Sequence, residues 1–197
     1  MTHILRIDSS PRDASSKTRD LTDLTIEQLS GEGVRITTRD ISHGLPMVSK
    51  AWTEGAYMDP SEQTEEHKAA LELSDQLVSE VKDADIIVIG MPMYNFNVPA
   101  SVKSWFDQIA RVGLTFRYTE SGPKGLLEDK RVIVLVATGG VQVGSDYDLM
   151  TPYVRHFFGF LGIDNVEFHA ADGLNGENAE ESLKEAKSEI REIGLVA

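Results

Sequence analysis

The stretch Asp85-Ile-Ile-Val-Ile-Gly-Met-Pro-Met-Tyr-Asn-Phe-Asn-Val98 decides the fold. Its residues 86–90 form an unbroken run of apolar or small side chains, and a loop of Pro, Tyr, Asn and Phe follows them. Such a run, bounded by turn residues, is typical of a strand that is buried on both faces of a parallel sheet. In open sheets of this kind, ligands bind at the loops that leave the carboxyl ends of the strands. We therefore expect residues 91–98 to face a ligand, and their aromatic side chains favour a flat ring system.

Strand and helix patterns alternate outward from this stretch along the whole chain. We expect the strands at residues 4–7, 34–39, 86–90, 131–138 and 165–169. We expect the helices between residues 18 and 31 and at residues 64–82, 99–109, 149–161 and 178–193. Strict alternation predicts a parallel sheet with helices on both faces. Five strands predict the flavodoxin-like order 2-1-3-4-5, an α/β three-layer sandwich formed by residues 1–197 as a single domain.

Three segments fall outside this alternation. We expect Ser42–Ser61 to be a long connection, and connections of this length are usually functional or form a lid. Leu114–Tyr118 is expected to be a short strand or the arm of a hairpin, and Glu120–Gly125 is expected to be a turn.

The composition excludes several classes of function. The net charge of −13 argues against nucleic-acid and anionic-membrane partners, because no basic surplus is present to neutralise phosphates. No apolar run approaches the roughly 18 residues of a membrane-spanning helix, and the strand pattern near the amino end leaves no room for a signal peptide. The chain has no cysteine, which excludes disulfides and thiol chemistry and agrees with the cytoplasmic location that we expect. The histidines show no metal-ligand spacing, so we expect no metal site.

The first loop, residues 9–18, is rich in hydroxyl groups and contains no glycine. It is therefore neither a Walker loop nor a Rossmann fingerprint, and both ATP and a dinucleotide are disfavoured there. Hydroxyl groups beside a helix N-terminus suit a phosphate, to which Arg12 and Lys17 could add positive charge. The alternative is that Ser15 or Ser16 simply caps the helix.

Two further loops leave the carboxyl ends of predicted strands. Tyr94 and Phe96 are either stacking surfaces or core aromatics, and the flanking prolines stiffen the loop that carries them. The Thr138-Gly139-Gly140 segment either allows close approach of its backbone to a ligand or forms a simple turn.

These motifs resemble the FMN-dependent NADH:quinone and azo-dye oxidoreductases of the flavodoxin-like superfamily, in the right order and over nearly the whole chain. The segments that carry the resemblance are Ser9-Ser10 with Ser16-Lys17-Thr18, Gly90-Met-Pro-Met-Tyr-Asn-Phe96, Gly113-Leu-Thr-Phe-Arg-Tyr-Thr-Glu-Ser-Gly-Pro-Lys-Gly-Leu126, Gly139-Gly140, and Thr151-Pro-Tyr153 with Phe158-Gly-Phe-Leu-Gly-Ile163. Pro-Met-Tyr-Asn-Phe together with Thr-Phe-Arg-Tyr-Thr is the most specific part.

The resemblance implies a homodimer that binds FMN near the subunit interface. The cofactor residues that it implies are Ser10, Ser16, Lys17 and Thr18 for the phosphate, Pro92, Met93, Tyr94, Asn95 and Phe96 along the isoalloxazine ring, and Ala137, Thr138, Gly139 and Gly140 at the side of the ring. The substrate residues that it implies are Tyr118, Phe158, Phe160 and Gln142, with Tyr118 and Phe160 possible contributions from the other subunit.

The implied activity is two-electron reduction of quinones and cleavage of aromatic azo compounds by NADH or NADPH. Hydride transfer would pass through flavin N5 in a ping-pong reaction, without a catalytic side chain. Relatives often have Ser-Arg-Gly-Gly where this chain has Ala137-Thr-Gly-Gly140, so the choice between NADH and NADPH and the physiological acceptor stay open. The alternative is a flavodoxin-like electron carrier without small-molecule turnover. The acidic charge suits both, whereas the long Ser42–Ser61 connection and the aromatic wall of Phe158 and Phe160 favour the enzyme.

Overall fold

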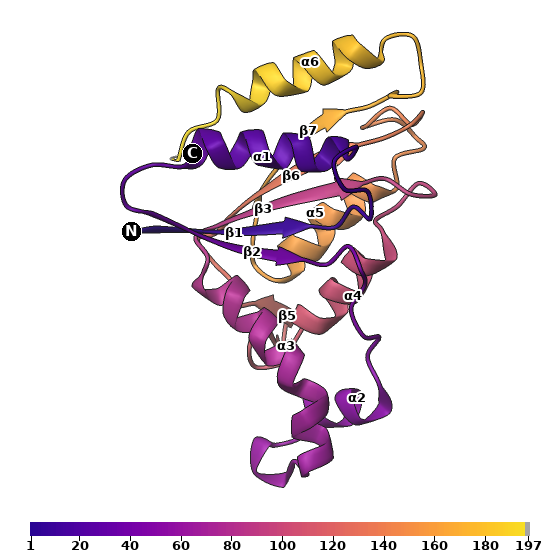
Figure 1. Cartoon of the computed structure of the whole chain (residues 1–197). Helices are drawn as coiled ribbons and strands as arrows, with labels where there is room; N and C mark the ends of the chain where they lie inside the picture. Colours follow the sequence, from indigo (N-terminus) through magenta and orange to yellow (C-terminus); the bar gives the residue numbers. More distant parts are fainter. Residues whose placement is uncertain (196–197) are drawn as a thin grey trace.

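Five parallel strands form the central sheet of the computed structural model, which describes residues 1–195 (Figure 1). Their order across the sheet is β2 (Val34–Asp40), β1 (Thr2–Asp8), β3 (Ile86–Pro92), β6 (Arg131–Ala137) and β7 (Asn165–Ala171). All four neighbouring pairs are parallel. Because β6 and β7 are the fourth and fifth strands of this sheet, the predicted order 2-1-3-4-5 is confirmed.

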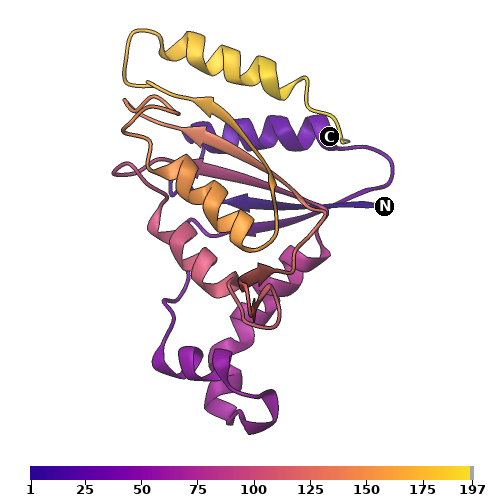
Figure 2. The ribbon, with the colours of Figure 1, turned by 180° about the vertical axis from the view of Figure 1, so that it is seen from behind.

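Helices cover both faces of the sheet, as predicted. One face carries α1 (Lys17–Leu29) and α6 (Ala179–Ile190), and the other carries α3 (Glu65–Asp83), α4 (Ala100–Ile109) and α5 (Met150–Phe160). Figure 2 views the molecule from behind and brings α5 in front of the sheet. No helix within residues 1–195 is long and apolar enough to cross a bilayer.

Strand β3 is buried along its whole length. Ile86 and Val88 join the apolar core beneath α1 and α6, whereas Ile87 and Ile89 join the core beneath α3, α4 and α5. This division follows from the alternation of side chains along a strand. At Gly90, an added Cβ would lie 2.6 Å from Thr22 Oγ1, so the absence of a side chain lets α1 pack closely on the strand.

The connection expected at Ser42–Ser61 contains a helix, α2 (Lys50–Tyr57), followed by the single 3-10 turn η1 (Pro60–Glu62). The long connection is thus present, and it contains a helix that the sequence did not predict. Helix α2 lies beside the start of α3, away from the sheet (Figure 1), and buried Trp52 donates a hydrogen bond from Nε1 to Gln108 Oε1 at 2.8 Å. This helix gains its stability from tertiary contacts, which periodicity over eight residues does not reveal.

The segment expected to be a turn, Glu120–Gly125, supplies a strand. β4 (Phe116–Thr119) pairs antiparallel with β5 (Gly122–Gly125), so only the first part of the segment turns. The sequence Gly-Pro-Lys-Gly has low strand propensity, which explains the wrong prediction. An added Cβ at Gly125 would lie 2.1 Å from Gly162 N, so close docking against the residues after α5 holds β5 in place.

Phe158 is a core residue, and its predicted role in the substrate wall is wrong. Its side chain is 0% exposed and packs against Trp105 and Phe106, with ring centroids 6.4 and 5.6 Å apart. A ligand cannot reach a side chain that has no exposed surface.

We expect Phe158→Ala to lower the free energy of unfolding by about 3–5 kcal/mol, because it opens a cavity in a packed core. Urea unfolding followed by circular dichroism, at matched protein concentration and without FMN, measures this change. Tyr57→Ala is the matched control, since Tyr57 is 62% exposed and should change stability by about 0.5 kcal/mol at most. Equal effects of the two substitutions would contradict the placement of Phe158.

Candidate functional site

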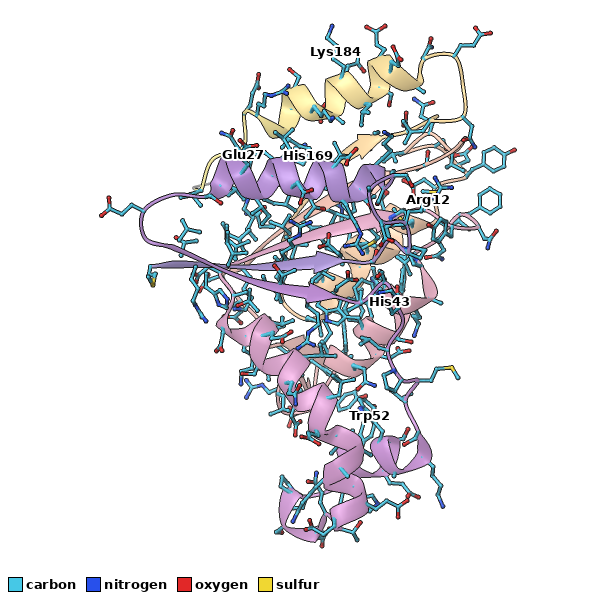
Figure 3. All side chains as sticks on the ribbon, in the orientation of Figure 1. Arg12, Glu27, His43, Trp52, His169 and Lys184 are labelled. Carbon is cyan, nitrogen blue, oxygen red and sulfur yellow. The ribbon has the colours of Figure 1, made fainter. Side chains whose placement is uncertain are left out.

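A pocket of about 380 Å³ lies at the carboxyl edge of the sheet, where the loops after β1, β3, β6 and β7 meet. Arg12, which lines it, lies at the end toward which the strands point (Figure 3). The lining residues are Ser10, Arg12, Ser15, Ser16, Lys17, Thr18, Pro92, Met93, Tyr94, Ala137, Thr138, Gly139, Leu174 and Asn175.

One end of the pocket is the N-terminus of α1. Ser16 caps this helix, because its Oγ accepts a hydrogen bond from Arg19 N at 3.3 Å, and it also lies 3.1 Å from Thr18 Oγ1. The N–H groups of Lys17 and Thr18 belong to the first turn, where a helix offers them no acceptor of its own. Free N–H groups, hydroxyl groups and the positive end of the helix dipole together form an anion site. Capping and ligand binding are therefore compatible roles for Ser16.

The charge of the pocket is opposite to that of the chain. Arg12 and Lys17 are the charged residues of the lining, and both are exposed. No carboxylate lines the pocket, although the chain has a net charge of −13. Within residues 1–195, the Lys17 ammonium lies 3.8 Å from Asp20 Oδ2, and Arg12 makes no ion pair. A dianionic phosphate would thus meet two cations and no acidic side chain in this pocket.

The other end of the pocket is the loop after β3. Met93 N donates to Ala137 O at 2.9 Å, which joins this loop to the end of β6. Pro92 and Met93 are buried, and Tyr94 is partly exposed beside them. The result is an apolar and aromatic wall with polar backbone groups along one side, a surface that suits a planar heterocycle.

The tip of this loop holds a strained backbone. Tyr94 and Asn97 exchange two backbone hydrogen bonds of 3.0 and 3.1 Å around Asn95 and Phe96. Asn95 and Phe96 adopt left-handed conformations with φ of 49° and 68°. For a residue with a side chain this conformation costs about 1–2 kcal/mol, and such strain is concentrated at functional sites. The Phe96 side chain at this tip is 49% exposed.

Phe96 faces a second exposed aromatic residue. Its ring centroid lies 6.4 Å from that of Tyr147, which is 71% exposed. Tyr147 belongs to the segment between β6 and α5, and the next residue, Asp148, fixes that segment in place. Asp148 is 4% exposed and accepts hydrogen bonds from Gly144 N at 2.9 Å and Met150 N at 3.1 Å.

The Asp148 carboxylate also accepts hydrogen bonds from the backbone N–H and the hydroxyl group of Thr151. Burial alone would raise the pKa of Asp148, but the hydrogen bonds from Thr151 and from the N–H groups of Gly144 and Met150 outweigh it and hold this pKa below its usual value. The carboxylate is therefore ionised at neutral pH and keeps the loop beside Phe96 ordered.

The loop after β7 completes the pocket, and sequence reasoning missed it. Leu174 N donates to Thr138 O at 3.0 Å, and Asn175 N donates to Gly139 O at 2.8 Å. An added Cβ at Gly139 would lie 2.5 Å from Asn175 Nδ2, so glycine permits this close packing. The signal was present, because the turn sequence Asp172-Gly-Leu-Asn-Gly176 directly follows the fifth strand and so lies at the same sheet edge.

Most of the predicted cofactor residues are brought together by the structure. Those that line the pocket are Ser10, Ser16, Lys17, Thr18, Pro92, Met93, Tyr94, Ala137, Thr138 and Gly139. Asn95, Phe96 and Gly140 lie in the same loops, outside the lining. The Thr138 hydroxyl donates to Val141 O and accepts from Gly173 N, so it holds two loops together.

The structure does not bring the remaining predicted substrate residues into the pocket. Gln142 is exposed on the segment between β6 and α5. Tyr118 and Phe160 both pack against Phe116, with ring centroids 5.6 and 4.6 Å apart. Phe160 ends α5, and this helix runs from the carboxyl edge of the sheet back to the start of β7. The aromatic cluster of Phe116, Tyr118 and Phe160 therefore lies at the far end of α5 from the pocket of its own chain.

Comparison with known proteins agrees with this geometry. Residues 2–193 match a family model described as "Flavodoxin-like fold", so the chain is a flavodoxin-like protein. It is 52% identical to FMN-dependent NADH:quinone oxidoreductase 1 of Jannaschia sp., over 88% of this chain and 90% of that protein. It is 43% identical to FMN-dependent NADH:quinone oxidoreductase 1 of Colwellia psychrerythraea, over 97% of this chain and 100% of that protein.

Among solved structures, the chain is similar to an FMN-dependent NADH-azoreductase from Bacillus anthracis in complex with FMN. The TM-score is 0.88 and the identity 28%, and the match covers 98% of this chain and 97% of that one. Within the flavodoxin-like class, the chain belongs to the family of FMN-dependent NADH:quinone oxidoreductases and NADH-azoreductases. The resemblance inferred from the sequence motifs is thus confirmed.

We expect Asp148→Asn to lower the free energy of unfolding by about 1–3 kcal/mol at neutral pH, because it leaves buried donors without good acceptors. The folded pKa of Asp148 lies below the unfolded value of about 3.9. Its contribution is therefore complete above the unfolded pKa and is lost as the pH falls through the folded pKa. Urea unfolding at a series of pH values should show a constant difference from the wild type above about pH 5, which shrinks below about pH 4.

Asp146→Asn is the control for this prediction, because Asp146 is exposed on the same segment. It should change stability by about 0.5 kcal/mol at most at every pH. A wild-type advantage over Asp148→Asn that persisted unchanged to about pH 2 would contradict the lowered pKa.

Proposed function

We propose that this protein is an FMN-dependent NADH:quinone oxidoreductase that also reduces aromatic azo compounds. The observation that carries the proposal is the pocket at the carboxyl edge of the sheet. It joins a cationic, hydroxyl-rich helix N-terminus at one end to a Pro-Met-Tyr wall at the other. A phosphorylated planar heterocycle has the same two parts. The names of the relatives, and the FMN complex among the similar structures, support the same cofactor.

The residues present fit FMN. Ser10, Ser16 and Thr18 offer hydroxyl groups to its phosphate, and Arg12 and Lys17 neutralise the phosphate charge. The stretch from Pro92 to Tyr94 lies against the ring, and the backbone of Ala137–Gly139 offers polar groups to the edge of the ring. When bound, FMN supplies the redox chemistry, taking electrons from NADH and passing two of them to the acceptor.

The pocket lining contains no Asp, Glu or His side chain. We propose that the protein contributes binding and orientation, and that the reaction proceeds without a catalytic side chain. The comparisons give no support to the alternative of an electron carrier. We further propose a cytoplasmic location, with which the cysteine-free sequence is compatible.

We also propose a homodimer in which Tyr118 and Phe160 of one chain complete the pocket of the other. Two observations support it. Tyr118 is 66% exposed and lies with Phe160 in an aromatic cluster that the pocket of the same chain does not include. Around the pocket, Phe96 and Tyr147 expose aromatic rings that a second chain could cover. A substrate wall built from two chains would bring Tyr118 and Phe160 of one chain against Phe96 and Tyr147 of the other.

The purified protein should be yellow, with an absorption band near roughly 450 nm that is characteristic of bound flavin. Mixing with NADH in a stopped-flow instrument should bleach this band, and benzoquinone or methyl red should restore it. Steady-state rates should give parallel double-reciprocal lines, because donor and acceptor use one site in turn. Protein that cannot be reconstituted with FMN would contradict the proposal. Reduced protein that transfers electrons only to protein partners would favour the carrier.

The dimeric site can be tested by complementation. Ser16→Asp should abolish FMN binding, and Tyr118→Ala should raise the KM for benzoquinone several-fold without changing FMN affinity. In a mixed dimer, the Tyr118→Ala chain keeps an intact FMN pocket and receives the wild-type Tyr118 from its partner. Random mixing of the two variants should therefore restore wild-type KM at about a quarter of all sites. A mixture that shows only the Tyr118→Ala kinetics, or a monomer by light scattering, would contradict the shared site.

A further inference from the structure

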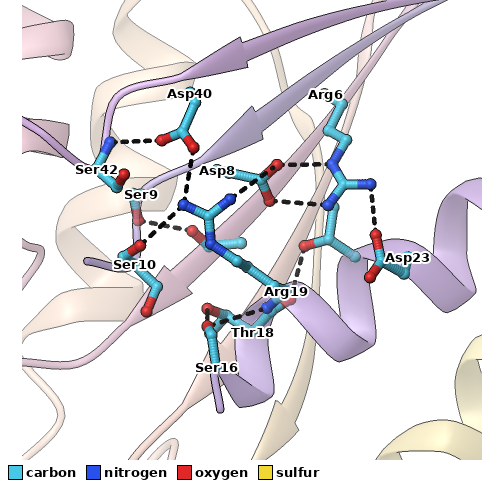
Figure 4. A network of polar contacts seen from close by, with 12 residues as sticks. Arg6, Asp8, Ser9, Ser10, Ser16, Thr18, Arg19, Asp23, Asp40 and Ser42 are labelled. Carbon is cyan, nitrogen blue, oxygen red and sulfur yellow. Dashed lines mark hydrogen bonds and ion pairs between the residues drawn. The ribbon is translucent and has the colours of Figure 1, made fainter. Parts of the chain in front are cut away.

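We infer that Arg19 is a positioning residue. It shapes the loop of residues 9–18, called the phosphate-binding loop below, without touching the phosphate. The inference rests on the proposed function, because the ligand of this loop is taken to be the phosphate of FMN. Arg19 lies in the first turn of α1, and its guanidinium group reaches under the loop that leaves β1 (Figure 4). It is absent from the lining of the pocket.

The guanidinium group holds two carbonyl groups of the loop. Nη2 of Arg19 donates to Ser10 O at 3.0 Å, and Nε donates to Arg12 O at 3.2 Å. A carbonyl oxygen that faced the pocket would repel a phosphate. Since Arg19 binds both oxygens, the loop presents hydroxyl groups and side-chain cations to the pocket instead. The planar, forked guanidinium group is suited to contacts of this kind, whereas an ammonium group is not.

Arg19 also acts on the cap of the helix. Its backbone N–H donates to Ser16 Oγ at 3.3 Å, which orients the hydroxyl group that lines the pocket. The side chain and the backbone of one residue thus fix both ends of the phosphate-binding loop, at Ser10 and at Ser16.

Two carboxylates outside the pocket lining neutralise the charge of Arg19. Nη2 donates to Asp40 Oδ2 at 2.8 Å, and Nη1 lies 3.6 Å from Asp8 Oδ2. Burial raises the pKa of Asp40, but hydrogen bonds from Ser42 and Arg19 outweigh it and lower this pKa, so the carboxylate stays ionised. Two carboxylates beside one guanidinium group leave little positive charge for long-range attraction. Arg19 therefore acts through the shape of the loop.

The same network contains a matched control. Arg6 donates from Nε to Asp8 Oδ2 at 2.8 Å and from Nη1 to Asp23 Oδ1 at 2.6 Å. Both arginines are largely buried and share Asp8, with 16% and 20% of their side chains exposed. Within the described residues, Arg6 makes no hydrogen bond to a carbonyl group of residues 9–18. Removing Arg6 perturbs the ion-pair network without releasing the loop.

The experiment compares FMN with riboflavin, which has the same ring but no phosphate. Dissociation constants for both ligands are measured by fluorescence quenching with the full-length apoprotein of the wild type, Arg19→Met, Arg19→Lys and Arg6→Met. We expect the wild type to prefer FMN. Arg19→Met should weaken FMN binding by about 10- to 100-fold, through misplaced hydrogen bonds to a charged group, and change riboflavin binding less than about threefold. Arg6→Met should leave the ratio of the riboflavin dissociation constant to the FMN dissociation constant at its wild-type value.

Arg19→Lys keeps the charge but offers one ammonium group to two carbonyl oxygens. Its ratio of riboflavin to FMN dissociation constants should therefore lie between those of the wild type and Arg19→Met. It also supplies the test if circular dichroism shows that Arg19→Met is unfolded. An equal loss of affinity for both flavins would overturn the inference, because Arg19 would then be only a structural residue. An unchanged ratio in both Arg19 variants would overturn it as well. A wild-type protein that binds FMN and riboflavin equally would refute the proposed phosphate site itself, and with it the role of Arg19.

Discussion

The burial of β3 on both faces is the constraint on which the rest of the structure depends. Ile86 and Val88 face one helical layer, and Ile87 and Ile89 face the other, so both layers must be present for this strand to be stable. Covered on both faces, the strand meets solvent only at its ends. Its carboxyl end leads into Met93–Phe96, and the backbone there has to leave the sheet in a tight, partly left-handed turn. The strain of the loop is thus a consequence of where the strand ends.

The pocket follows from the same constraint. The helix after β1 packs on one face of the sheet, and the helix after β3 packs on the other. Because these neighbouring strands send their chains to opposite faces, their loops diverge and leave a crevice between them. The loop from β1 brings a helix N-terminus to this crevice, and the loop from β3 brings apolar and aromatic side chains. The chemical asymmetry of the pocket, cationic at one end and apolar at the other, is therefore built into the topology.

The features that the sequence predicted are those with a local signal. Continuous apolar runs identified β3 and β6, and the carboxyl-end rule then located most of the pocket. Features that depend on contacts between residues far apart in the sequence were not predicted. α2 is held by Trp52 against Gln108, and β5 by the residues that follow α5. Phe158 follows Val154 by four residues and lies on the buried stripe of α5, whereas Phe160 lies off that stripe and packs near Phe116. The helical period therefore favours a core position for Phe158, and the wrong expectation of a substrate contact came from the family resemblance alone. The loop of Leu174 and Asn175 also follows a predicted strand, but it was missed because it carries no aromatic or cationic motif.

The two ends of the pocket are built from different segments, and they can therefore change independently. The cationic end, where we propose that the phosphate binds, depends on the loop from β1, and Arg19 binds Ser10 and Arg12 of this loop as well as Asp40. The apolar end, where we propose that the ring binds, depends on the loops after β3, β6 and β7, which are joined by hydrogen bonds at Ala137 and Thr138. Thr138, where the resemblance led us to expect an arginine, lies at this apolar end of the pocket. Within residues 1–195, none of the hydrogen bonds and ion pairs of Arg19 involves that end, so a substitution at Thr138 leaves the network of Arg19 in place.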